Sequence, residues 1–120
     1  MKRHSIPINI DPDDVPAVIC ALDLVANMNT DGPFQKQLNF HNCQSVVIKL
    51  RSGIRNFTLN EARVLCVGIT TALDLIAGVE NPYISMAELE PEWQSELKKN
   101  LFVYTRLYPV FTSIILSHSE

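Results

Sequence analysis

Two carboxylates stand out because each lies inside an otherwise apolar stretch. Asp23 is the one charged residue between Val15 and Thr30, and Asp74 is the one charged residue between Val64 and Ala77. Burial of a carboxylate is costly unless it is paired or hydrogen-bonded. If the two faced each other across two helices, they could share a proton or bind a cation. The simpler interpretation, which we favour, places each on a narrow solvent-facing stripe of its helix.

His41 and Cys43 combine a base and a nucleophile within three residues. On a regular helix, side chains two positions apart point about 200° from each other, so this pair cannot meet. Catalysis by such a pair also needs a third group that orients the base. The chain contains no glycine loop for phosphate, no Cys-x-x-Cys and no His-Glu-x-x-His pattern. We therefore expect no catalytic activity, no metal site and no cofactor.

Charge is distributed unevenly along the chain. Residues 36–63 contain five bases and one acid, whereas residues 74–96 contain six acids and no Lys or Arg. The basic region could bind an anionic ligand or a nucleic acid, although the net charge of -3 and the scarcity of nearby aromatic residues make nucleic acid the weaker option. The candidate residues of this alternative function are Lys49, Arg51, Arg55 and Arg63.

Aromatic residues gather in the last third of the chain. Residues 93–111 hold five of the nine Phe, Trp and Tyr residues. One helical face cannot bury all of the apolar side chains there, and large exposed apolar patches mark contact sites. We therefore predict a protein-protein interaction or assembly module, which forms a homodimer or binds another protein. The alternative is a bundle that covers its last helix on both sides. The predicted contact residues are Trp93, Phe102, Tyr108 and Phe111.

The composition indicates one small globular domain. The chain has 120 residues, of which 47% are hydrophobic and 19% are charged, enough apolar surface for one core. We expect residues 1–10 to form an extended N-terminal arm and residues 11–120 to form a single helical domain. No export signal is evident, and the longest apolar stretch, residues 101–116, is too short to span a membrane. Three cysteines, an odd number, indicate free thiols and a cytoplasmic protein.

Local signals predict an all-α fold, a compact antiparallel bundle of about four main helices with short extra turns. The strongest signal is the capping box from Thr58 to Glu61, which begins a helix that ends at Gly78. Ser85 begins one further short turn. We expect a joint in residues 39–43, and Pro109 should kink or end the last helix, with residues 110–117 helical rather than extended. The main helices are predicted near residues 14–29, 34–53, 59–77 and 91–108.

Overall fold

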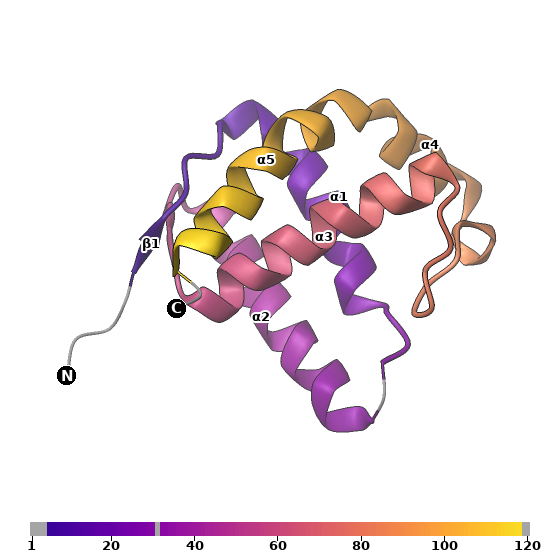
Figure 1. Cartoon of the computed structure of the whole chain (residues 1–120), viewed down its shortest axis with the longest axis horizontal. Coiled ribbons are helices and arrows are strands. Elements are labelled where there is room, and N and C mark those ends of the chain that lie inside the picture. Colours follow the sequence, from indigo (N-terminus) through magenta and orange to yellow (C-terminus); the bar gives the residue numbers. More distant parts are fainter. Residues whose placement is uncertain (1–4, 31, 119–120) are drawn as a thin grey trace.

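The structure, a computed structural model, describes residues 5–30 and 32–118 of the chain. Helices dominate this part, which confirms the all-α class (Figure 1). The first four residues of the expected arm, Asp31 and the last two residues lie outside the described residues. The elements are β1 (Ile6–Pro7), η1 (Pro12–Asp14), α1 (Val15–Ala26), α2 (Pro33–Arg51), β2 (Asn56–Phe57), α3 (Leu59–Ala77), η2 (Met86–Glu88), α4 (Pro91–Lys99) and α5 (Leu101–His118).

The strongest local signals define their helices as predicted. The Thr58 hydroxyl accepts from the Glu61 N–H at 3.1 Å, and the Glu61 carboxylate accepts from the Thr58 N–H at 2.8 Å. Gly78 ends α3 in the left-handed conformation, with φ of 78°, which costs glycine nothing because it has no Cβ. Ser85 begins the single turn η2.

The predicted joint in residues 39–43 is wrong, because α2 continues through that segment to Arg51. No proline or glycine interrupts the helix there, and a regular helix needs such an interruption to kink sharply. The Gln35 side chain also donates to Asn39 Oδ1 one turn later, at 2.9 Å. Residues 39–43 are therefore part of one continuous helix.

The predicted helix from Pro91 to Tyr108 is two helices instead. Asn100 ends α4, and its side chain donates to the Glu96 carbonyl at 2.9 Å. Pro109 does not end α5, which continues to His118. The prediction that residues 110–117 are helical rather than extended is therefore confirmed. Proline removes one backbone hydrogen bond, and packing of Phe111 and Ile114 against the core beyond it offsets that loss.

Helix α3 lies at the centre of the molecule and has its most extensive contacts with α1 and α5. Figure 1 shows α1 crossing α3 steeply, so the antiparallel arrangement of four helices is not confirmed. The crossing is close because α3 carries Gly68 there: a Cβ at this position would lie 3.2 Å from the Ala21 carbonyl oxygen. Ala21 itself is fully buried.

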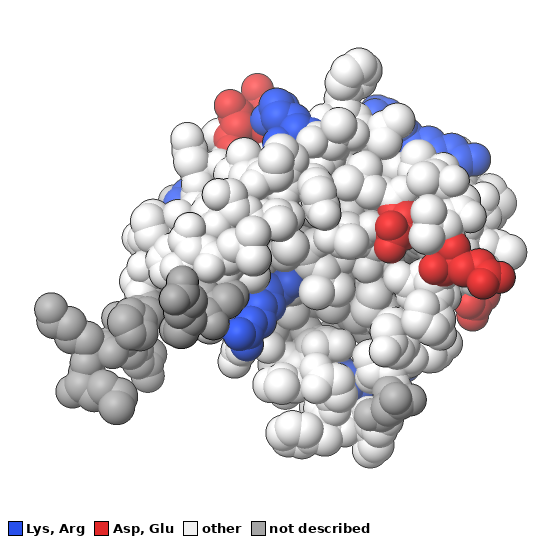
Figure 2. All heavy atoms as spheres, viewed as in Figure 1, with Lys and Arg blue, Asp and Glu red and all other residues white. Residues whose placement is uncertain are grey.

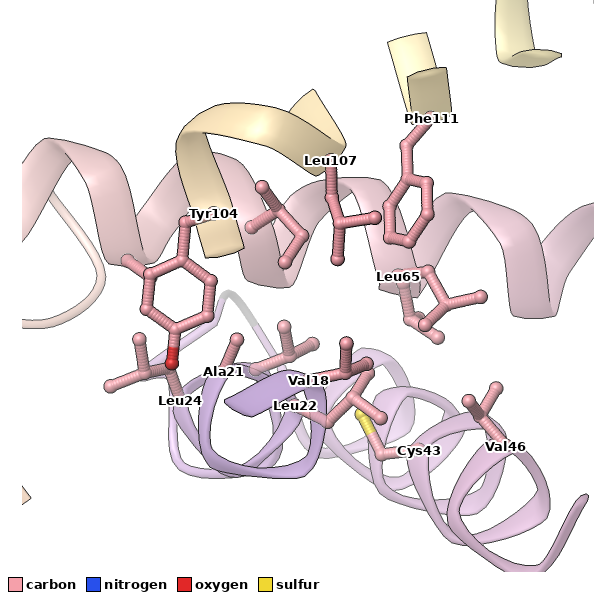
Figure 3. Packing of buried hydrophobic residues seen from close by; sticks show 14 of the residues in the cluster. Val18, Ala21, Leu22, Leu24, Cys43, Val46, Leu65, Tyr104, Leu107 and Phe111 are labelled. Atoms are coloured by element: carbon pink, nitrogen blue, oxygen red, sulfur yellow. The ribbon is translucent and has the colours of Figure 1, made fainter. Parts of the chain in front are cut away.

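One face of α5 completes the core. Figure 3 shows Tyr104, Leu107 and Phe111 pointing from α5 toward the buried side chains of α1 and α3. The Tyr104 hydroxyl donates to the Ala17 carbonyl at 2.8 Å, which satisfies a polar group that is shielded from water. Arg106 Nη2 lies 2.9 Å from Asp14 Oδ1, so an ion pair also connects α5 to the start of α1.

The segment before η1 packs against the domain. Residues 6 and 7 pair with residues 57 and 56 in a two-stranded antiparallel sheet, and the Ile8 N–H donates to the Arg55 carbonyl. Ile6, Ile8 and Ile10 are all buried. The described part of the expected arm, residues 5–10, is therefore extended and contributes side chains to the core.

The α1–α3 crossing predicts the effect of Gly68→Ala. Alanine favours a helix over glycine by about 1 kcal/mol, but its Cβ would press on the backbone of α1, and overpacking costs about 1–3 kcal/mol. We expect the free energy of unfolding to fall by about 1 kcal/mol, measured by urea denaturation. Val67→Ala, at the exposed neighbouring position, should change it by less. A gain in stability for Gly68→Ala would show that α1 and α3 do not approach this closely.

Candidate functional site

The outer face of α5 is a large, nearly uncharged surface. Phe102 is 89% exposed, Leu116 is 68% exposed and Tyr108 is 42% exposed. The one Asp, Glu, Lys or Arg in the helix is Arg106, and its guanidinium already binds Asp14. Figure 2 shows a largely uncharged surface over α5, with charged side chains at its rim. No helix of the described chain is both long and apolar enough to cross a membrane.

A protrusion and a groove lie on this same face. The groove is a shallow, open depression of about 530 Å³ along the last three turns of α5, lined by residues from Tyr108 to Ser117. Phe102, Pro109, Ser113 and Leu116 follow the spacing of seven, four and three residues that keeps side chains on one side of a helix. Phe102 and the middle of the groove are about ten residues apart, or roughly 15 Å along the axis.

The structure separates the four predicted contact residues. Phe102 and Tyr108 are exposed on the outer face of α5, whereas Phe111 is only 1% exposed and belongs to the core. Trp93 is half-buried and lines a groove between α1 and α4, next to Cys20. The break at Asn100 gives α4 and α5 different buried faces, so the four residues do not share one surface. Phe111 is therefore not part of the candidate contact surface on α5.

Two of the four predicted basic residues hold the fold together. Lys49 Nζ donates to Glu61 Oε1 at 2.7 Å and to the Asn56 carbonyl at 3.1 Å. Arg55 Nε donates to the Ile10 carbonyl at 2.8 Å, which ties the N-terminal segment to the loop before β2. Arg51 and Arg63 are exposed. The basic residues therefore do not act as one free patch, because half of them already have buried partners.

Glu61 is a buried carboxylate for which the sequence predicts one role, the cap of α3. Besides the Thr58 N–H, it accepts from the hydroxyl of Ser45 and the ammonium of Lys49, both on α2. Burial raises the pKa of Glu61, but these hydrogen bonds outweigh it and bring the pKa below the ordinary value of 4.5. The spacing of Ser45 and Lys49, one helical turn apart, was the available signal.

The two singled-out carboxylates are not joined in the structure. Asp23 is exposed and lines the groove between α1 and α4, whereas Asp74 does not line that groove. Burial raises the pKa of Asp23, and the nearby Arg51 charge opposes the change. No hydrogen bond between Asp23 and Asp74 occurs in the described chain, and no metal-binding group of three His, Cys, Asp or Glu residues is found within it.

His41 and Cys43 also point in different directions. Cys43 is buried, and burial raises the pKa of its thiol to about 12, with the Asp23 charge adding to the shift. At neutral pH the thiol stays protonated and is a poor nucleophile. His41 is exposed and its ring meets the Phe40 ring edge-on, with centroids 6.3 Å apart. This pair forms no nucleophile-base arrangement.

Comparison of the chain with models of protein families, with curated proteins and with solved structures finds no match.

The Glu61 cluster predicts a pH-dependent contribution to stability. Because the pKa of folded Glu61 lies below 4.5, the stabilisation is fully present above pH 4.5 and is lost as the pH falls through the folded value. Glu61→Gln should lower the free energy of unfolding by about 1–3 kcal/mol at pH 7. Denaturation curves at pH 7 and pH 3 measure this. The difference between the two proteins should shrink at pH 3, and an equal difference at both pH values would contradict the pairing.

Proposed function

We propose that this protein is a small assembly module without a catalytic step of its own, which self-associates through the outer face of α5. The observation that carries the proposal is the exposed Phe102 on the same helical face as the groove at residues 108–117. In a two-fold symmetric pair of antiparallel α5 helices, each Phe102 would lie over the groove of the other copy. The symmetry axis would pass close to residues 107 and 108, midway between Phe102 and Ser113.

Association of two copies through the outer face of α5 would remove apolar surface from contact with water. A fully buried aromatic side chain contributes roughly 1.5–3 kcal/mol, and in a symmetric dimer each contact occurs twice. Phe102, Tyr108 and Leu116 supply the apolar area, while the hydroxyl of the exposed Ser113 can bond to the partner or to water across the contact. Packing of the other face of α5 in the core keeps this surface in place before association.

The lack of charge on the outer face favours a second copy over a charged partner. A partner with acidic or basic residues would leave them desolvated against an apolar and hydroxyl surface, which is costly. A second copy brings the same face, on which the one Asp, Glu, Lys or Arg residue of α5, Arg106, is already paired with Asp14. Tyr108 lies near the expected axis, where the same surface of both copies must meet.

The cysteines support a cytoplasmic location for this module. Cys20, Cys43 and Cys66 are free thiols, and Cys43 is buried in the core. Unpaired thiols persist where the compartment is reducing. We therefore place the proposed assembly in the cytoplasm.

The proposal predicts that Phe102→Asp will dissociate the assembly. A charge in place of the central ring should weaken association by about 2 kcal/mol or more, roughly thirtyfold in the dissociation constant. Light scattering across a concentration series should give the dimer mass for the wild type and the monomer mass for Phe102→Asp. Circular dichroism should show unchanged helix content. Phe34→Asp, at a 77% exposed aromatic position on α2, is the matched control and should remain dimeric. A wild type that stays monomeric at every concentration would refute the proposal.

The antiparallel arrangement predicts a mixing experiment. Phe102→Lys and Ser113→Glu should each weaken the homodimer, because each puts a charge against an uncharged surface. Mixed together, the two variants should form a heterodimer, in which the new lysine faces the new glutamate and the other Phe102–Ser113 contact remains native. Native mass spectrometry distinguishes the three species. Failure of the mixture to associate, while the wild type dimerises, would exclude this arrangement.

A further inference from the structure

A second groove lies away from α5, where the N-terminal half of α2 stands apart from the rest of the domain. Figure 1 shows this half of α2 projecting from the body of the molecule, and residues 33–38 are all exposed. Between it and α3 is a hollow of about 440 Å³, closed at one end by the end of α1 and by Tyr83. Its volume falls in the range of small-ligand sites, about 300–1,000 Å³.

The floor of this groove is apolar and its walls are polar. Val25, Met28 and Val64 are buried side chains that line it. The walls carry four uncharged amides, two of which, Gln35 and Asn39, already hydrogen-bond to each other. Each side-chain amide offers both N–H donors and a carbonyl acceptor, which is the pattern a peptide-like amide group needs from its surroundings. The other two amides are Asn42 and Asn60.

Arg63 is the one charged side chain among the described residues that line the groove, and none of those residues is acidic. Within the described chain, no carboxylate lies within 4.0 Å of the Arg63 guanidinium. Lys49 and Arg55, by contrast, are held by partners inside the fold. Among the described residues Arg63 thus has no carboxylate partner that would compete with an external anion, and guanidinium binds carboxylates with paired, charge-assisted hydrogen bonds.

Thr30 adds an unsatisfied polar group to the wall. Its hydroxyl oxygen is shielded from solvent and has no hydrogen-bond partner among the residues that the structure describes. The groove therefore combines apolar area, side-chain amides and an arginine in one place.

We propose that this groove binds an organic carboxylate in which an apolar group and a peptide-like amide lie next to the carboxylate. The apolar group would lie on the Val25, Met28 and Val64 floor, the amide would bond to the wall amides, and the carboxylate would bind Arg63. An N-acylated amino acid and the C-terminal residue of a peptide share this chemistry. The proposal does not depend on self-association, because no residue of α5 lines the groove.

The probes are N-acetyl-leucine and its neutral carboxamide, titrated into the isotope-labelled full chain and followed by the backbone amide signals in NMR spectra. The carboxylate should give saturable shifts confined to residues 35–42 of α2 and 60–67 of α3. The neutral carboxamide should bind at least tenfold more weakly, because it cannot pair with Arg63. Equal binding of the two probes, or the absence of saturable shifts at the groove, would overturn the proposal.

Two variants separate charge from shape. Arg63→Gln should weaken binding of N-acetyl-leucine at least tenfold, whereas Lys98→Gln, at an exposed base on α4, should leave it unchanged. Val67→Trp should block the groove sterically while keeping the arginine. Thermal unfolding verifies that each variant is folded. If Arg63→Gln and Lys98→Gln weakened binding of N-acetyl-leucine equally, nonspecific charge attraction would explain the binding. That result would contradict the site.

A longer probe distinguishes the two sources of the ligand. A pentapeptide that ends in leucine with a free carboxylate should bind at least tenfold more tightly than N-acetyl-leucine if the natural ligand is a protein C-terminus. Equal affinities would identify a small acylated amino acid as the ligand class. Both results require Arg63, and binding of either probe that survives Arg63→Gln would refute the proposal.

Discussion

The close crossing of α1 and α3 is the constraint on which the rest of the structure depends. Glycine at position 68 lets the two backbones approach closely, because a Cβ there would lie 3.2 Å from the Ala21 carbonyl oxygen. The resulting layer buries the apolar faces of both helices, and α5 covers its remaining side through Tyr104, Leu107 and Phe111. Since α5 uses one face for this purpose, its other face remains available for contacts outside the monomer.

Polar residues fix the relative positions of the elements. The Tyr104 hydroxyl and the Arg106 guanidinium attach α5 to the start of α1, and the Glu61 cluster attaches α2 to the beginning of α3. These bonds use the charged groups that a sequence alone would assign to ligand binding. Among the exposed surfaces of the described chain are the outer face of α5, whose one Asp, Glu, Lys or Arg residue is Arg106, and the groove beside Arg63 on α3.

Much of the fold could be predicted from local signals, whereas the surfaces could not. Thr58, Glu61 and Gly78 act within one turn of their own helix, so the limits of α3 follow from the sequence. The break at Asn100 and the continuation through Pro109 depend on packing against α1 and α3, which are distant in sequence. Phe102 was identified correctly as exposed, but Phe111 was not identified as buried, because the shift in helical phase at Asn100 has no local signature. The roles of Lys49 and Arg55 likewise depend on partners 12 and 45 residues away.

The central claim is that the outer face of α5 meets the same face of a second copy in antiparallel orientation. It is tested most directly by isotope-filtered NMR on a mixture of labelled and unlabelled protein, which detects contacts between copies only. The account predicts cross-peaks between the Phe102 ring of one copy and the Thr112 and Leu116 methyl groups of the other. Contacts between copies that arise from α2 or α4 alone, or none at concentrations well above the dissociation constant, would contradict it.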